Sequence, residues 1–410
     1  MDGSRQSESE ALLNKSKHFC MLPWSHMHVW PEGKVFPCCA ADPLLPLSDY
    51  EGSLAEAWNS EKIRQLRMSM LQDRPSKVCT RCYDLEKVGM SSLRTFANQR
   101  FGKFIAGDLS ATESDGTVRQ MRMRHLDIRF SNLCNLKCRS CGPNLSHSWV
   151  TDYEAVYGKL PWKVLRLDAS FWQDLKPHLQ EVETAFFAGG EPIICDELYQ
   201  ILDHWLKIDH TNVELNYTTN FTTLKYRDKS VLDYWGKFPQ TRISASLDAA
   251  GERAEFLRSG SKWKIIEDNR LRMLEELPDV YFEIAPTISV YNVWHFPDFH
   301  REWIEKGLVA ADHLRLTILT NPSQLSIGVI PHKDRQNLIK KWELSLSQMR
   351  GGFGAGDNFE QSYATVIKFL QEAPEIPTKS FWAFNDMLDY LRKETVLDVF
   401  PELEVLREAL

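Results

Sequence analysis

Eight residues in the first half of the chain decide its fold class: Cys134-Asn135-Leu136-Lys137-Cys138-Arg139-Ser140-Cys141. They follow directly on a strand predicted at residues 125–130. One loop with this spacing can wrap one face of a cubane iron–sulfur cluster, with each sulfur on a different iron. Three ligands leave the fourth iron open, and an open position distinguishes a reactive site from a structural one. A zinc loop with a fourth ligand such as His147 is the alternative.

Strands and helices alternate from this loop onward. Apolar runs predict strands at 125–130, 184–188, 213–218, 242–247, 281–290 and 313–319, and helices at 144–158, 171–180, 196–207, 229–236, 262–277 and 296–307. Such alternation is typical of a parallel sheet with right-handed crossovers. Active groups then lie at the carboxyl ends of the strands. We therefore expect an α/β fold, open or barrel-like.

A second motif ends the second predicted strand, where residues 187–192 read Phe-Ala-Gly-Gly-Glu-Pro. Two glycines, Gly189 and Gly190, let the backbone pass close to a ligand. The Glu191 carboxylate, at a strand end, can accept a hydrogen bond from an ammonium group. Alone, such a turn often only ends a strand. Its place about fifty residues after the cysteine loop makes it informative.

Together the two motifs resemble the signature of the radical S-adenosylmethionine (SAM) superfamily. The resemblance implies a [4Fe–4S] cluster on Cys134, Cys138 and Cys141, whose open iron binds the amino and carboxylate groups of SAM. It implies that an electron from the cluster cleaves the sulfonium, and that a 5′-deoxyadenosyl radical abstracts hydrogen from a substrate. It also implies a partial (β/α)6 TIM-like barrel over residues 120–331 and an external electron donor such as flavodoxin or ferredoxin.

The resemblance extends to further strand ends that meet SAM in the family. Residues 246–248, Ser-Leu-Asp, resemble the fourth strand of the peptide-modifying branch, and Arg258 resembles the arginine that pairs with the SAM carboxylate. Phe221 stands where the family has glycine, which leaves the backbone of that loop in question. The implied SAM contacts are Gly189, Gly190, Glu191, Pro192, Asn220, Ser246 and Arg258.

Five more cysteines precede the predicted barrel: Cys20, Cys38, Cys39, Cys79 and Cys82. A hairpin predicted at 25–30 and 34–37 turns at Gly33, and a helix is predicted at 54–71. This region resembles the twitch domain, the shortened relative of the SPASM domain, placed here before the barrel. The resemblance implies an auxiliary [4Fe–4S] cluster on four of the cysteines, namely Cys20, Cys38, Cys79 and Cys82. A tetrahedral zinc site is the alternative. We expect His26 and His28 on an exposed face of the hairpin.

Composition sets the remaining expectations. The 410 residues are 43% apolar and 26% charged, an ordinary globular balance. No apolar run reaches the length of a membrane helix, and the start is too polar for a secretory signal, so we expect a cytoplasmic protein without a membrane partner. The net charge of −7 argues against nucleic-acid binding. The expected parts are a disordered arm over 1–18, the cluster domain over 19–95, the barrel over 120–331 and a helical extension over 332–410.

These features predict a radical SAM oxidoreductase with an auxiliary cluster that accepts or relays an electron. The Ser-Leu-Asp segment and the helical extension favour a peptide substrate that is oxidised or cross-linked. A twitch-type dehydrogenase acting on a small alcohol or sugar is the competing enzyme. A zinc-stabilised binding module is the competing protein that is not an enzyme.

Overall fold

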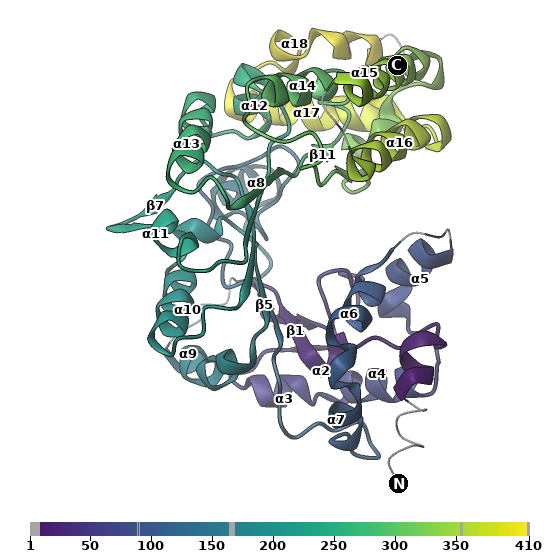
Figure 1. The fold of residues 1–410 in the computed structure, drawn as a ribbon. Coiled ribbons are helices and arrows are strands. Elements are labelled where there is room, and N and C mark those ends of the chain that lie inside the picture. Colours follow the sequence, from purple (N-terminus) through teal and green to yellow (C-terminus); the bar gives the residue numbers. More distant parts are fainter. Residues whose placement is uncertain (1–8, 88, 90, 164–168, 353–355, 408–410) are drawn as a thin grey trace. The chain divides into compact units, whose positions relative to one another are not determined.

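A computed structural model describes every residue except 1–8, 88, 90, 164–168, 353–355 and 408–410 (Figure 1). The chain divides into two units. Unit 1 contains Met1–Asn132, Trp162–Gly190 and Cys195–Leu215, and unit 2 contains Leu133–Pro161, Glu191–Ile194 and Asn216–Leu410. None of the helices in the described part of the chain is long and apolar enough to cross a membrane.

Unit 1 is built on five hydrogen-bonded strands in the order β3-β2-β1-β4-β5. The strands are β1 (His26–Val29), β2 (Lys34–Phe36), β3 (Ser48–Asp49), β4 (His125–Ile128) and β5 (Thr184–Phe187). β1 and β2 form the predicted antiparallel hairpin, and Gly33 in its turn has φ 84°, a value that favours glycine. β1, β4 and β5 are parallel. The predicted cluster domain and the first two predicted barrel strands therefore share one sheet.

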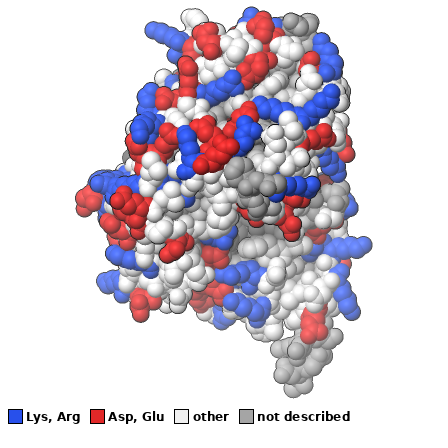
Figure 2. Space-filling model, turned by 45° about the horizontal axis from the view of Figure 1, so that its top comes forward, with Lys and Arg blue, Asp and Glu red and all other residues white. Residues whose placement is uncertain are grey.

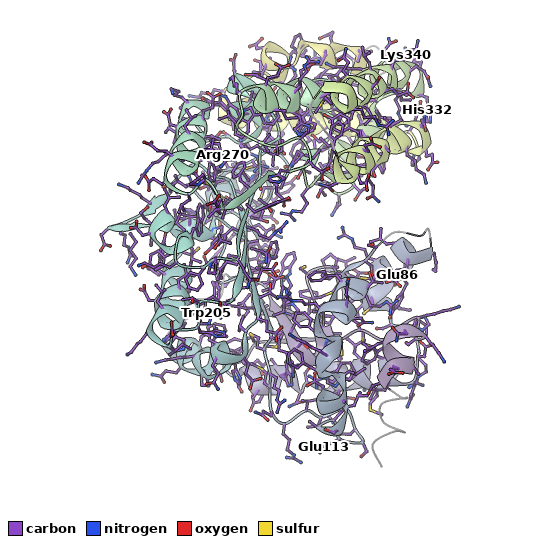
Figure 3. All side chains as sticks on the ribbon, in the orientation of Figure 1. Glu86, Glu113, Trp205, Arg270, His332 and Lys340 are labelled. Carbon is purple, nitrogen blue, oxygen red and sulfur yellow. The ribbon has the colours of Figure 1, made fainter. Side chains whose placement is uncertain are left out.

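The two faces of this sheet differ in polarity. Figure 1 shows α9 (Ala169–Leu175) and α10 (Asp196–Lys207) on one side of β5 and α6 (Leu93–Phe101) on the other. Trp205 of α10 lies with its ring centroid 6.4 Å from that of Phe187 and donates a hydrogen bond to the Leu179 carbonyl at 2.9 Å (Figure 3). Apolar side chains of β1, β4 and β5 thus face α10.

The opposite face of the sheet is polar, and there the expected exposure of His26 and His28 is wrong. His26 and His28 are 2% and 1% exposed, not on an exposed face. Parallel pairing with β4 places His125 and Asp127 beside them, and the Phe101 ring of α6 lies 6.3 Å from that of His125. The alternation of His26 and His28 is also that of a half-buried strand, but it cannot tell which face is covered.

The region before the sheet also differs from expectation. Residues 9–14 are helical, whereas composition predicted a disordered arm over 1–18; residues 1–8 lie outside the described part. Leu12 and Leu13 pack against the buried cluster that contains Phe19 and Phe101. Two apolar side chains are enough to dock a short helix onto a preformed core.

The helix predicted over 54–71 is interrupted. It forms α3 (Leu54–Trp58) and α4 (Glu61–Leu71), with Asn59 between them. The Asn59 side chain donates to the Val118 carbonyl and accepts from the Val118 amide, each at 3.0 Å. The fully buried Arg67 donates to the Trp58 carbonyl at 3.0 Å. These hydrogen bonds satisfy polar groups at the break between the two helices. The local sequence does not indicate any of them. Helices α2 (Leu22–Ser25), α5 (Thr80–Lys87) and α7 (Ile105–Ser110) complete this region.

Unit 2 receives the chain within β6 (Glu214–Thr219) and continues with the parallel pair β9 (Thr241–Ala245) and β10 (Tyr281–Ile284). The strand predicted at 281–290 is split, because Pro286 lacks an amide hydrogen between β10 and β11 (Thr287–Ile288). β11 pairs in parallel with β12 (Thr317–Ile318). The helices of this part are α8 (Val150–Tyr157), α11 (Val231–Trp235), α12 (Gly251–Leu257), α13 (Trp263–Glu276) and α14 (Phe296–Glu305).

A buried arginine connects helix α13 with strand β10 in unit 2. Arg270 of α13 donates to the Leu308 carbonyl at 2.7 Å, and its guanidinium lies 4.0 Å from the ring centroid of Phe282 in β10 (Figure 3).

Charged side chains of both signs are interspersed on the face drawn in Figure 2.

The predicted helical extension is present. It consists of α15 (His332–Gly352), α16 (Asp357–Glu372), α17 (Thr378–Arg392) and α18 (Val396–Val399). Arg139, from the cysteine loop, is 1% exposed and donates to Asn385 Oδ1 of α17 at 2.9 Å. It also pairs with Asp389 of the same helix. The extension therefore buttresses the cysteine loop. The expected fold class, α/β with parallel strands and a helical carboxyl-terminal part, is confirmed.

Candidate active site

The cysteine loop of unit 2 is fixed by hydrogen bonds to its backbone. Trp149 Nε1 donates to the Cys138 carbonyl at 2.7 Å, and Ser148 Oγ donates to the Cys134 carbonyl at 2.8 Å. The Cys141 amide donates to the Cys138 carbonyl at 3.0 Å. The three cysteines form no disulfide, so their thiols are available as ligands.

The three thiols lie close enough to influence one another. The pKa of Cys134 and of Cys141 is raised to about 12, mainly by burial and with a smaller contribution from a neighbouring Cys138 thiolate. Burial also raises the pKa of Cys138, which Arg258 opposes. Thiols that resist ionisation at neutral pH become thiolates when they ligate a metal. The loop thus fits a positively charged centre that binds all three.

The spacing of the thiols bears on the zinc alternative. A single zinc ion 2.3 Å from each sulfur would bring the sulfurs to about 3.8 Å from one another. Within the described residues, no three cysteine sulfurs lie within 4.8 Å of one another. His147 Nδ1 accepts a hydrogen bond from the Cys134 amide at 3.1 Å, so that nitrogen is not free to bind zinc. The three thiols therefore do not stand at the spacing of a zinc site.

Glu191 lies beside the loop and is 1% exposed. One carboxylate oxygen accepts from Thr219 Oγ1 and the other from the Asn220 amide, each at 2.7 Å. The first oxygen also accepts from the Ile193 amide at 3.2 Å. These bonds join Glu191 to the end of β6. A carboxylate offers about four lone-pair sites, so the expected hydrogen bond from an ammonium group stays a prediction.

Replacing Glu191 with glutamine is expected to change how stability depends on pH. Burial raises the pKa of this carboxyl from an ordinary 4.5 to about 7, so folding favours the protonated form. The wild-type free energy of unfolding therefore falls as the pH rises through about 7, by an amount on the order of 3 kcal/mol. Glu191→Gln cannot titrate, so its stability lacks this loss. Urea denaturation of the cluster-free chain, at pH values from about 4.5 to above 7, measures the difference between the two proteins.

The exposed Glu154 provides a matched control, since Glu154→Gln changes the same chemistry at the surface of α8. Its stability curve is expected to follow that of the wild type. Parallel curves for the wild type and Glu191→Gln would mean that Glu191 does not titrate in this range.

Asn220 and Phe221 form the loop after β6. Asn220 Nδ2 lies 4.0 Å from Cys134 Sγ and donates to Asn135 Oδ1 at 2.9 Å. Phe221 has φ 58°, the left-handed conformation that favours glycine. Its ring is fully buried, 5.2 Å from that of Phe282. The loop thus adopts a glycine-like backbone with a phenylalanine, and burial of the ring offsets a strain of about 1–2 kcal/mol.

Arg258 is held beside the thiols. Its Nη2 forms a 2.8 Å ion pair with Asp248 Oδ2, and its Nη1 lies 3.8 Å from Cys138 Sγ. Its Nε is buried without a hydrogen-bond partner. Asp248 is fixed in turn, because its Oδ1 accepts from the Thr287 amide at 2.8 Å. Asp248 was missing from the expected site residues, although its place in the Ser-Leu-Asp segment was a signal. The Ser246 amide donates to the Thr219 carbonyl at 2.8 Å.

Gly189 and Gly190 belong to unit 1. Gly189 has φ 124°, and a Cβ atom there would lie 3.2 Å from Cδ of Arg129. Both the conformation and the space therefore require glycine at this turn.

Four cysteines of unit 1 gather as the sequence led us to expect. The pKa of Cys79 is raised to about 12, mainly by burial and with a smaller contribution from a Cys82 thiolate. Burial also raises the pKa of Cys20, with smaller contributions from Cys79 and Cys82. The pKa of Cys38 is likewise raised, by burial and then by neighbouring thiolates that include Cys20 and Cys79. These mutual effects place the four thiols around one centre.

The surroundings of this centre bring in a positive charge. Arg94 donates to Glu86 Oε1 at 2.9 Å (Figure 3) and to the Phe19 carbonyl at 2.8 Å. Arg94 also lowers the pKa of Cys20 and Cys79, against the larger effect of burial. Arg94 therefore partly offsets the burial that disfavours thiolates, the form in which cysteine binds a metal.

Two family models match these two groups of cysteines. Residues 20–83 match the SPASM iron–sulfur cluster-binding domain, and residues 128–311 match the radical SAM superfamily. The chain belongs to the radical SAM superfamily. Its cofactors are SAM and [4Fe–4S] clusters, one that binds SAM and one auxiliary, as the sequence predicted.

Several solved structures of the superfamily are similar to this chain. The structure of anSMEcpe with bound AdoMet matches with 17% identity and a TM-score of 0.40, over 56% of this chain and 59% of that one. SuiB of Streptococcus suis bound to S-adenosylmethionine matches with 15% identity and a TM-score of 0.36, over 72% and 62%. TYW1 with a lysine–pyruvate adduct matches with 17% identity and a TM-score of 0.30, over 53% and 70%. The chain thus spans less than two thirds of the first of these structures. No curated protein matches it.

Proposed function

We propose that this radical SAM enzyme reductively cleaves SAM and abstracts hydrogen from a peptide, which is then oxidised or cross-linked. The observation that carries the proposal is the group of free thiols Cys134, Cys138 and Cys141, with the Arg258 guanidinium 3.8 Å from one of them. A guanidinium beside three cluster ligands can form paired hydrogen bonds with the carboxylate of a ligand that binds the open iron.

In this proposal the three thiolates hold a [4Fe–4S] cluster, which supplies the electron for SAM cleavage when it is bound. Arg258 orients the SAM carboxylate, and Asp248 positions Arg258. Asn220 and Ser246 contribute polar groups at the ends of the third and fourth predicted strands. Glu191 bonds to the end of β6 through both its oxygens and, in this proposal, also accepts a hydrogen bond from the SAM ammonium group. Gly189, Gly190 and Pro192 shape the turn.

Replacing Arg258 with lysine is expected to weaken SAM binding by about 1–3 kcal/mol. A lysine ammonium is a point charge and cannot reproduce the paired hydrogen bonds of a planar guanidinium. Calorimetric titration of SAM into the reconstituted, anaerobic protein measures the loss. Arg272→Lys, at an exposed ion pair with Glu276, is the control and should bind SAM as the wild type does. Unchanged affinity of Arg258→Lys at full iron content would remove Arg258 from the SAM site.

The peptide substrate is supported by the Ser-Leu-Asp segment and by the helices that buttress the cysteine loop through Arg139. The test is anaerobic turnover with SAM, reduced flavodoxin or dithionite, and deuterated candidate substrates in separate reactions. The proposal expects deuterium in 5′-deoxyadenosine and a modified peptide. Transfer from a small alcohol or sugar alone would favour the competing dehydrogenase. Stoichiometric zinc without iron after anaerobic reconstitution would overturn both enzymes.

A further inference from the structure

A second group of potential metal ligands lies in unit 1 and contains no cysteine. It consists of His26 on β1 and of His125 and Asp127 on β4. The strands are parallel with His26 opposite His125, so all three side chains stand on one face of the sheet. One ligand atom from each residue lies within 4.8 Å of the other two. Within the described residues, no other histidine, cysteine or carboxylate group of three meets this limit.

The tautomer of His26 leaves one nitrogen ready to bind. Its Nδ1 lies 2.9 Å from the His125 carbonyl oxygen. A carbonyl oxygen can only accept, so Nδ1 carries the proton and Nε2 keeps a lone pair. Histidines that bind metals through one nitrogen usually make this kind of hydrogen bond with the other.

The remaining donor atoms differ in their surroundings. The Asp127 carboxylate is 0% exposed, and Arg129 Nη2 and His28 Nδ1 lie 3.1 and 3.3 Å from it. The Cys39 thiol also hydrogen-bonds to this carboxylate. His125 Nδ1, in contrast, is buried without a hydrogen-bond partner. Buried polar groups normally have a partner, so this nitrogen points to a missing ligand on this face.

We infer that His26, His125 and Asp127 bind one divalent first-row transition-metal ion. Two imidazoles and a carboxylate form the donor set of non-haem iron(II) sites, and they also bind Mn²⁺ and Zn²⁺. Three protein ligands leave coordination positions for water or for a polar group of a substrate. Arg129 and His28 are positioning residues that hold the Asp127 carboxylate. This inference does not depend on the proposed function.

Mn²⁺ is the probe for this site, because it prefers nitrogen and oxygen donors to the thiolates of the cysteine sites. Manganese chloride is titrated into the full-length protein with both clusters reconstituted and oxidised. The electron paramagnetic resonance signal of free Mn²⁺ then reports how much is bound. We expect one Mn²⁺ per chain, and pulsed measurements should detect nitrogen coupling from imidazole. Absence of stoichiometric binding, or binding without nitrogen coupling, would overturn the inference.

Two variants assign the site. His26→Ala and Asp127→Asn are each expected to weaken Mn²⁺ binding by roughly 10–100-fold or more. His332→Ala, at an exposed histidine of α15 (Figure 3), is the control and should bind as the wild type does. Iron content and circular dichroism verify folding. If His26→Ala does not fold, the near-isosteric Asp127→Asn decides. Unchanged affinity in a folded variant contradicts the inference.

Discussion

Replacing Cys134, Cys138 and Cys141 together by alanine is expected to abolish SAM cleavage and to leave about half of the iron. Two cubane clusters contain roughly eight irons per chain, and this triple variant keeps only the auxiliary ligands. Of the six cysteines that remain, the four proposed auxiliary ligands lie in unit 1. In the proposal their cluster has four cysteine ligands and no open iron, so it does not bind SAM. Iron and sulfide analysis and the yield of 5′-deoxyadenosine measure the two effects.

Cys195→Ala is the control, because Cys195 is a buried cysteine that forms no disulfide and lies outside both groups. It should keep all of the iron and the full yield of 5′-deoxyadenosine. If the triple variant still cleaves SAM, the three cysteines do not hold the reactive cluster. Loss of all iron from a folded triple variant would mean that the unit 1 cysteines bind no cluster of their own.

The parts of the fold that could be predicted are those with a local signal. The helix predicted at 196–207 coincides with α10, because its apolar residues repeat at the helical period and Asp196 and Glu197 stand in its first turn. The hairpin of β1 and β2 was equally clear, since Gly33 permits its turn. The spacing of the cysteines identified the family because ligands on one loop are close in sequence.

What could not be predicted depends on contacts between distant residues. Arg139 meets Asn385 across 246 positions, and Asn59 meets Val118 across 59. In neither pair does the local sequence around one residue indicate which distant residue it will contact. The burial of His26 and His28 likewise follows from pairing with β4, about 99 positions later. Polar residues in a strand pattern suggest solvent. Only the tertiary structure shows that β4 lies beside β1 and that Phe101 of α6 packs on the face these residues share.

The same contrast between local signals and distant contacts holds for individual residues of the candidate site. The Gly-Gly-Glu-Pro motif marked Glu191, whereas its hydrogen bonds with Thr219 and Asn220 came from the structure. Arg258 was marked by resemblance, whereas the Asp248 carboxylate that fixes it came from the structure. A motif thus located the site, but the hydrogen bonds decided which residues face a ligand and which hold their neighbours in place.

Replacing Cys79 and Cys82 together by alanine is expected to separate SAM cleavage from product formation. Abstraction of a hydrogen atom leaves a carbon radical on the substrate, and a net two-electron oxidation needs an acceptor for the second electron. A cluster with four cysteine ligands suits electron transfer better than direct binding of substrate. The double variant should therefore keep the unit 2 site and cleave SAM, while the oxidised product is lost or diverted. Measuring 5′-deoxyadenosine and modified substrate in the same reactions gives both quantities.

The competing explanation is that the unit 1 centre only stabilises the fold, as closed thiolate sites often do. This is plausible because β1 of the hairpin pairs with β4, so loss of the centre can disturb the strand that leads to the cysteine loop. In that case 5′-deoxyadenosine and product would fall together, and circular dichroism would report the damage. Cys195→Ala, at a buried cysteine outside both groups, is again the control and should preserve both yields. A folded double variant that forms the oxidised product at the wild-type rate would exclude the auxiliary cluster as the electron acceptor.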